Sequence, residues 1–75
     1  MKREVQVGHV YRHFKGTLYK VICICKDSED LSLKVVYEDE FSKKIWVRDK
    51  EAFLSLVDKD KYPNANQKYR FELVD

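Results

Sequence analysis

The sequence lacks a long hydrophobic run and a leader-like start. No apolar stretch approaches the roughly 20 residues that a membrane-spanning helix needs. The first residues also lack a hydrophobic block followed by a small-residue cleavage site. We therefore expect a cytoplasmic protein that has no membrane partner.

Cysteine is scarce, since the chain holds only Cys23 and Cys25. Both lie in a run that reads as a strand, where same-face neighbours stand roughly 7 Å apart, a poor fit to disulfide geometry. Strict alternation would place them on the face of Tyr19 and Val21. We therefore expect two free thiols that act as buried packing residues.

The few histidines and cysteines do not predict a zinc site. In an extended chain His9 and His13 would lie roughly 13 Å apart, which is too far for one ion. Cys23 and Cys25 are also closer in sequence than paired zinc ligands usually are. We predict no metal ion and no cofactor.

Motifs of common enzyme families and a strong excess of charge are missing too. The sequence contains no phosphate-binding loop, dinucleotide fingerprint or nucleophile elbow. Fifteen Lys and Arg against thirteen Asp and Glu give a net charge of +2, whereas dedicated nucleic-acid binders usually carry a strong basic excess. With 75 residues the chain has room for a single domain, 1–75, whose small core favours a surface groove over a deep pocket.

What the sequence does contain is a series of short segments with strand-like alternation. These segments are 9–13, 18–26, 31–37, 41–48 and 69–73, and polar residues separate them. Asp49 is suited to cap a helix, and the apolar residues Phe53, Leu54 and Val57 follow at helical spacing, which predicts a short helix at about 49–58. The expected fold is mainly β: a small five-stranded antiparallel SH3-like barrel with one short helix before the last strand.

One run of residues is specific enough to suggest a family. Tyr11-Arg12-His13-Phe14-Lys15-Gly16 is followed three positions later by Tyr19, and further matches lie at Gly8, Val21, Val35-Val36-Tyr37, Trp46-Val47-Arg48, Phe53 and Arg70-Phe71. On these residues the chain resembles a small bacterial family known as domain of unknown function sixteen fifty-three. The resemblance implies a compact SH3-like β fold of bacterial origin with no assigned activity. Asp49 stands where this family usually has a proline, and segment 58–68 is longer and more polar than is usual.

Aromatic and basic residues gather in two segments that a barrel could bring side by side. Aromatic rings stack on bases or pack against peptide side chains, and arginine adds bidentate contacts to phosphate or carboxylate. We therefore predict a noncatalytic binding module for a protein segment, slightly favoured by the charge balance, or for nucleic acid. The candidate binding residues are Tyr11, Arg12, His13, Phe14, Lys15, Trp46 and Arg48.

Two other interpretations fit the same residues. In a small enzyme His13 would be the general base beside Arg12, because histidine titrates near neutral pH. In a purely structural domain Phe14 and Trp46 would belong to the core, and self-association would use an exposed strand edge. The sequence leaves the ligand and the oligomeric state open.

Overall fold

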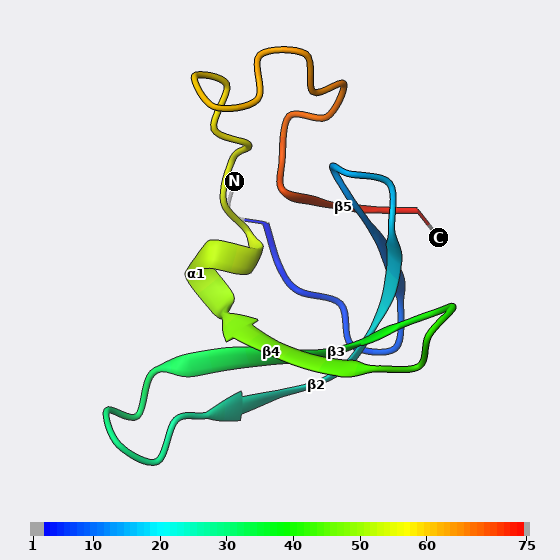
Figure 1. Cartoon of the computed structure of the whole chain (residues 1–75). Coiled ribbons are helices and arrows are strands. Elements are labelled where there is room, and N and C mark those ends of the chain that lie inside the picture. The colour runs from blue at the N-terminus through cyan, green and yellow to red at the C-terminus, as the bar shows by residue number, and fades with distance from the viewer. Residues whose placement is uncertain (1–2, 75) are drawn as a thin grey trace.

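The computed structural model describes residues 3–74, and within them five antiparallel strands form one sheet with a single short helix (Figure 1). The elements are β1 (Val10–His13), β2 (Leu18–Lys26), β3 (Leu33–Asp39), β4 (Ile45–Asp49), α1 (Lys50–Phe53) and β5 (Phe71–Leu73). The prediction of a mainly β chain with five antiparallel strands and one helix before the last strand is confirmed.

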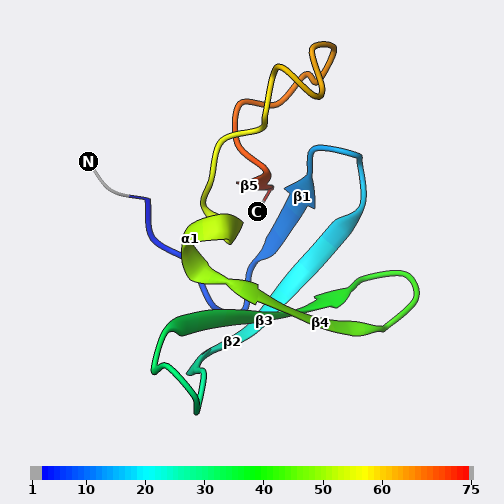
Figure 2. The same cartoon turned by 60° about the vertical axis from the view of Figure 1, so that its left-hand side comes forward.

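The strands follow the order β4-β3-β2-β1-β5, so β4 and β5 are the two edges of the sheet. β5 pairs with β1 through three residue positions and does not pair with β4 among residues 3–74. The sheet is strongly bent, and α1 lies between its two ends (Figures 1 and 2). It is not closed into a barrel, so barrel closure by the last strand is not confirmed.

A β-bulge in β2 bends the sheet. Because it adds one residue to the strand, the residues after it face the side opposite to the one that strict alternation predicts. The register with β3 shifts between Val21 and Cys23, which leaves Ile22 without a partner position. Before the bulge Val21 points into the core, whereas after it Ile24 does so. Cys23 and Cys25 are consequently exposed free thiols, and the expectation that they would be buried is wrong.

The core is built around two stacked phenylalanine rings. Phe53 and Phe71 lie 4.1 Å apart between ring centroids, with 9° between the ring planes, and both are fully buried. Tyr37 contacts both rings, at 5.6 and 5.4 Å, and Tyr11 meets Phe53 edge-on at 5.2 Å. The guanidinium group of Arg3 adds hydrogen bonds to the carbonyls of Leu54 and Phe71. These contacts connect the chain after β4 with the edge strand β5.

The helix is much shorter than the predicted 49–58, because the chain after Leu54 pairs with a distant segment. The amide of Val57 donates to the carbonyl of Lys68 at 2.9 Å, and the amide of Arg70 donates to the carbonyl of Ser55 at 2.8 Å. These bonds between two extended segments occupy backbone amides and carbonyls that would bond within the chain if the helix were longer. Tertiary pairing has therefore overridden the local helical spacing.

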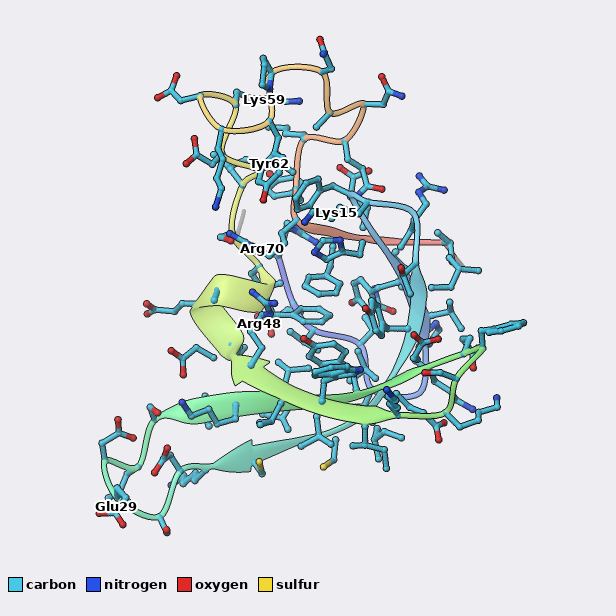
Figure 3. The ribbon with its side chains drawn as sticks, viewed as in Figure 1. Lys15, Glu29, Arg48, Lys59, Tyr62 and Arg70 are labelled. Carbon is cyan, nitrogen blue, oxygen red and sulfur yellow. The ribbon has the colours of Figure 1, made fainter. Side chains whose placement is uncertain are left out.

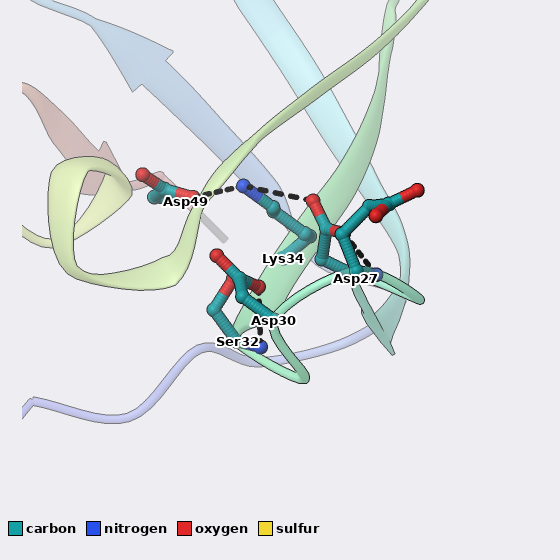
Figure 4. Close-up of polar contacts among 6 residues, drawn as sticks. Asp27, Asp30, Ser32, Lys34 and Asp49 are labelled. Carbon is teal, nitrogen blue, oxygen red and sulfur yellow. Dashed lines mark hydrogen bonds and ion pairs between the residues drawn. The ribbon is translucent and has the colours of Figure 1, made fainter.

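Asp49 precedes α1, but its carboxylate makes no hydrogen bond to the free amides of the first turn. It binds the ammonium group of Lys34 instead, and Lys34 also lies 3.7 Å from Asp27 (Figure 4). The hydrogen bond to Asp49 raises the pKa of Lys34. In the turn between β2 and β3, the amide of Ser32 donates to the carboxylate of Asp30 and lowers its pKa. This exposed network ties the turn between β2 and β3 to the start of α1.

Gln67 holds the long segment between α1 and β5 against β1. Its side chain is only 7% exposed, and its amide nitrogen donates to the carbonyls of Arg12 and Tyr69 at 3.0 and 2.9 Å. Its amide oxygen accepts from Nε of Arg12 at 2.8 Å. Because the buried amide has three hydrogen-bond contacts, these offset the cost of removing it from water, and the contact fixes the segment against β1.

Replacing Phe71 by alanine is expected to lower the free energy of unfolding by about 3–5 kcal/mol, because it leaves a cavity beside the ring of Phe53. Urea denaturation at pH 7 measures the change. Phe41→Ala is the matched control, since that ring is 97% exposed, and it should change stability by less than about 0.5 kcal/mol. Equal effects of the two substitutions would contradict this description of the core.

Candidate anion-binding site

Three cations meet on the open side of the sheet, between the edges β4 and β5. Lys15 comes from the turn between β1 and β2, Arg48 from β4, and Arg70 from the residue before β5. Figure 3 shows them following one another along this side of the molecule. All three lie near His13: Arg48 and His13 both contact the ring of Phe71, the carbonyl of Arg70 accepts from the amide of Phe14, and the amide of Lys15 donates to His13. Each of the three cations lowers the pKa of His13 by its positive charge. We call Lys15, Arg48 and Arg70 the cationic cluster.

Strand register brings Arg48 and Trp46 onto the inner face. In β4, Arg48 stands opposite Val35 and Trp46 stands opposite Tyr37, and both of these partners belong to the core. Paired residues of an antiparallel ladder share a face, so Trp46 and Arg48 point toward the concave side. Nε of Arg48 donates to the hydroxyl of Tyr37 at 3.2 Å, and its guanidinium carbon lies 5.7 Å from the Phe71 ring centroid. Arg48 therefore covers the core at the point where the sheet is open.

The other two cations are also held by specific contacts. Nε of Arg70 donates to the hydroxyl of Ser55 at 3.2 Å, and that hydroxyl donates to the carbonyl of Ala52. The ammonium group of Lys15 lies 5.2 Å from the ring centroid of Tyr62 and 5.9 Å from that of Phe14. The two rings contact each other at 4.8 Å, so they form a small aromatic wall beside the cluster.

His13 lies at the centre of the site in its neutral form. Its ring packs on Phe14 at 4.5 Å and edge-on against Phe71 at 4.9 Å. Partial burial, followed by the charges of Arg48, Arg70 and Lys15, lowers its pKa from 6.5 to about 4. Nδ1 accepts a hydrogen bond from the backbone amide of Lys15 at 3.1 Å, so the neutral ring carries its proton on Nε2.

The positive charge of the cluster is not neutralised by the protein itself within the described chain. The ion pairs between residues 3 and 74 involve Lys34 and Lys43, and neither arginine of the cluster nor Lys15 is paired with a carboxylate there. No acidic group contributes to the pKa of His13 either. The arrangement thus supplies two guanidinium groups, one ammonium group and a neutral N–H donor to an anion.

The structure separates the residues that the sequence proposed for binding into two groups. His13, Phe14, Lys15 and Arg48 meet on the open side, and Trp46, which is 49% exposed, lies on the same face two residues from Arg48.

Tyr11 and Arg12 lie elsewhere. The ring of Tyr11 is 2% exposed, and its hydroxyl accepts a hydrogen bond from the amide of Gln6, so it is a core residue rather than a surface contact. The side chain of Arg12 is directed to Gln67. Strand alternation explains this, because Arg12 faces away from its neighbours Tyr11 and His13.

Sequence reasoning missed Arg70 and Tyr62. Arg70 directly precedes Phe71, and its basic side chain next to a core aromatic was a signal that could have included it in the site. Tyr62 lies in a polar segment whose path depends on the pairing of residues 55–57 with 68–70, so no local pattern could have placed it.

The described residues contain neither a cluster of metal ligands nor a membrane-spanning helix. Between residues 3 and 74, no group of three or more His, Cys, Asp or Glu side chains is arranged to hold a metal ion. In the same range, no helix has the length and apolar character that crossing a bilayer requires.

Comparison with known proteins gives one match. Residues 9–73 match a family model described as "Protein of unknown function (DUF1653)", which covers the cationic cluster and every strand. No curated protein and no solved structure matches the chain.

The positive charge of the cationic cluster should be measurable as a lowered pKa of His13. We expect the His13 imidazole to titrate near pH 4, and Arg48→Gln to raise this pKa because Arg48 is the cation that lowers it most. Histidine ring proton shifts recorded by NMR between pH 3 and 8 measure both values. A His13 pKa near 6.5 in the native protein would contradict the arrangement.

The same shift predicts how stability depends on pH. A lowered folded-state pKa means that the unfolded chain binds the proton first, so the contribution of neutral His13 is complete above pH 6.5 and is lost as pH falls toward 4. Urea denaturation of the native protein and His13→Gln across this window should show a smaller loss of stability in the variant. Parallel curves would contradict the prediction.

Proposed function

The chain belongs to the family described as protein of unknown function DUF1653, and we propose that it is a noncatalytic binding module whose cationic cluster holds an anionic group of its partner. We also propose that the bent sheet is an SH3-like barrel left open on one side. The strand order and the bulge in β2 support this fold, because both curve one sheet around a single core.

The observation that carries the proposal is three positive charges around one neutral imidazole without a carboxylate among the described residues. Three positive charges gathered around one side chain repel one another, and an anion placed between them would relieve the repulsion. Guanidinium groups bind carboxylate and phosphate through two parallel hydrogen bonds, which gives such a site direction as well as charge.

An acidic protein segment fits the site better than a nucleic acid strand. The cations form one compact cluster, whereas proteins that follow a nucleic acid backbone need a basic groove over several nucleotides. The net charge of +2 also falls short of the strong basic excess that dedicated nucleic-acid binders usually carry.

The geometry gives little support to His13 as a general base. A base works best when its pKa is near the working pH, and a pKa of about 4 makes the imidazole a weak proton acceptor at pH 7. Its Nδ1 is also occupied by the amide of Lys15. The role that suits this histidine is donation of the Nε2 proton to a bound anion.

Removing one cation should weaken anion binding without changing the fold. We expect Arg48→Gln or Arg70→Gln to reduce the affinity for a hexaglutamate peptide at least about tenfold, because each loses a charge-assisted contact. Lys20→Gln is the matched control, since Lys20 is exposed at a β2 position facing away from the core, and it should change the affinity less than twofold.

Backbone NMR titrations in 50 mM salt measure these affinities and show whether the shifts converge on His13, Lys15 and Arg48. Absence of shifts there with hexaglutamate, or an equal loss in Lys20→Gln, would overturn the acidic-segment proposal. Tighter binding of a hexathymidine strand with a steep salt dependence would assign the site to nucleic acid instead.

A further inference from the structure

We propose that the free edge of β4 accepts an extended peptide as an additional antiparallel strand, in which acidic residues alternate with apolar ones. This inference rests on the proposed function, because the acidic side chains of the added strand would reach the cationic cluster. The partner would thus bind through its backbone, and its sequence would alternate acidic with apolar residues.

The backbone groups of β4 alternate between facing β3 and facing away from it. The amide of Asp39 donates to the carbonyl of Lys44 at 2.9 Å, which makes this pair a hydrogen-bonded position of the β3–β4 ladder. Antiparallel ladders alternate between hydrogen-bonded and non-hydrogen-bonded pairs. Trp46 and Arg48 therefore direct their backbone groups toward β3, and Ile45 and Val47 direct theirs away from it.

The outer side of β4 has no neighbouring strand, because β4 is the last strand in the sheet order. The structure places no backbone partner against the amides and carbonyls of Ile45 and Val47 from any residue between 3 and 74. These groups form a short row of donors and acceptors of the kind that an incoming strand uses.

The two faces of the β4 edge carry different side chains. Ile45 and Val47 lie on the convex face and are 63% and 62% exposed. Trp46 and Arg48, which belongs to the cationic cluster, lie on the concave face. Because cross-strand pairs share a face, a strand added here would present apolar residues to Ile45 and Val47, and an acidic residue to Arg48.

A second copy of this chain fits the edge of β4 less well than an acidic peptide does. A two-fold pairing of β4 centred on Trp46 would place Lys44 of each copy opposite Arg48 of the other. A pairing centred on Val47 would run into α1, which begins at Lys50, and one centred on Ile45 would run into the turn at Lys43, whose φ is 66°. Like charges directly opposite each other destabilise a strand pair, and two-fold symmetry repeats each of them. Charge complementarity therefore favours an acidic peptide over self-association.

The test uses a blocked seven-residue peptide of alternating glutamate and valine and two N-methylated versions of it. In the proposed register the valine amides face β4 and the glutamate amides face away. N-methylation of every valine removes the ladder donors and should weaken binding at least about tenfold. N-methylation of every glutamate leaves those donors in place, so the affinity should stay within about threefold. Backbone NMR titration measures both affinities and should show Ile45 and Val47 amide shifts with the unmodified peptide.

A protein variant provides the matching evidence. Val47→Pro removes only an edge-facing donor, because proline is tolerated on edge strands where no ladder bond is lost. It should weaken binding of the alternating peptide at least about threefold, as expected for one lost hydrogen bond, but keep the hexaglutamate shifts at His13 and Lys15. An unchanged amide spectrum outside β4 verifies that the variant is folded.

The outcomes separate the two proposals. If the valine-methylated peptide binds as tightly as the unmodified one and still shifts Arg48, strand addition is wrong and the anion site stands. If no acidic peptide shifts the cluster at all, both proposals fail. If sedimentation shows a dimer of the protein alone, with Ile45 and Val47 amides protected from exchange, the edge belongs to a second copy and the peptide proposal is overturned.

Discussion

The stacked rings of Phe53 and Phe71 connect the two ends of the sheet, which backbone hydrogen bonds leave apart. Phe53 ends the helix that follows β4, and Phe71 begins β5. Their contact keeps the sheet curved around one core even though its edges do not pair. The candidate site depends on this contact as well, since Arg48 and His13 both pack on the ring of Phe71. The cationic cluster thus lies on the side where β4 and β5 do not pair.

Strand positions could be predicted from the sequence because alternation of apolar and polar residues is a local signal. Two features could not. The bulge at Ile22 adds one residue to β2 and turns Cys23 outward, although nothing around it marks an irregularity. The helix stops at Phe53 because residues 55–57 pair with 68–70 across a long connection. Both outcomes depend on partners that are distant in sequence.

The candidate site could be predicted in part for the same reason. His13, Phe14, Lys15 and Arg48 stood out as a basic and aromatic combination, and the bent sheet brings them to one side. The sequence could not show that Tyr11 fills the core while His13, two residues later, lies at its rim. It also gave no means of placing Tyr62 next to Lys15, because that contact depends on Gln67 anchoring the segment to β1.

The bulge in β2 also limits how this strand can change during evolution. If β2 kept all its residues but paired without the bulge, every position after Ile22 would reverse its facing, which would bury Cys23 and expose Ile24. Exchange of one side chain for another at those positions leaves the facing intact. Deletion of the residue at Ile22, in contrast, would give a regular strand with the same facing, so homologous proteins that lost one residue in this stretch are expected to have lost it at the bulge.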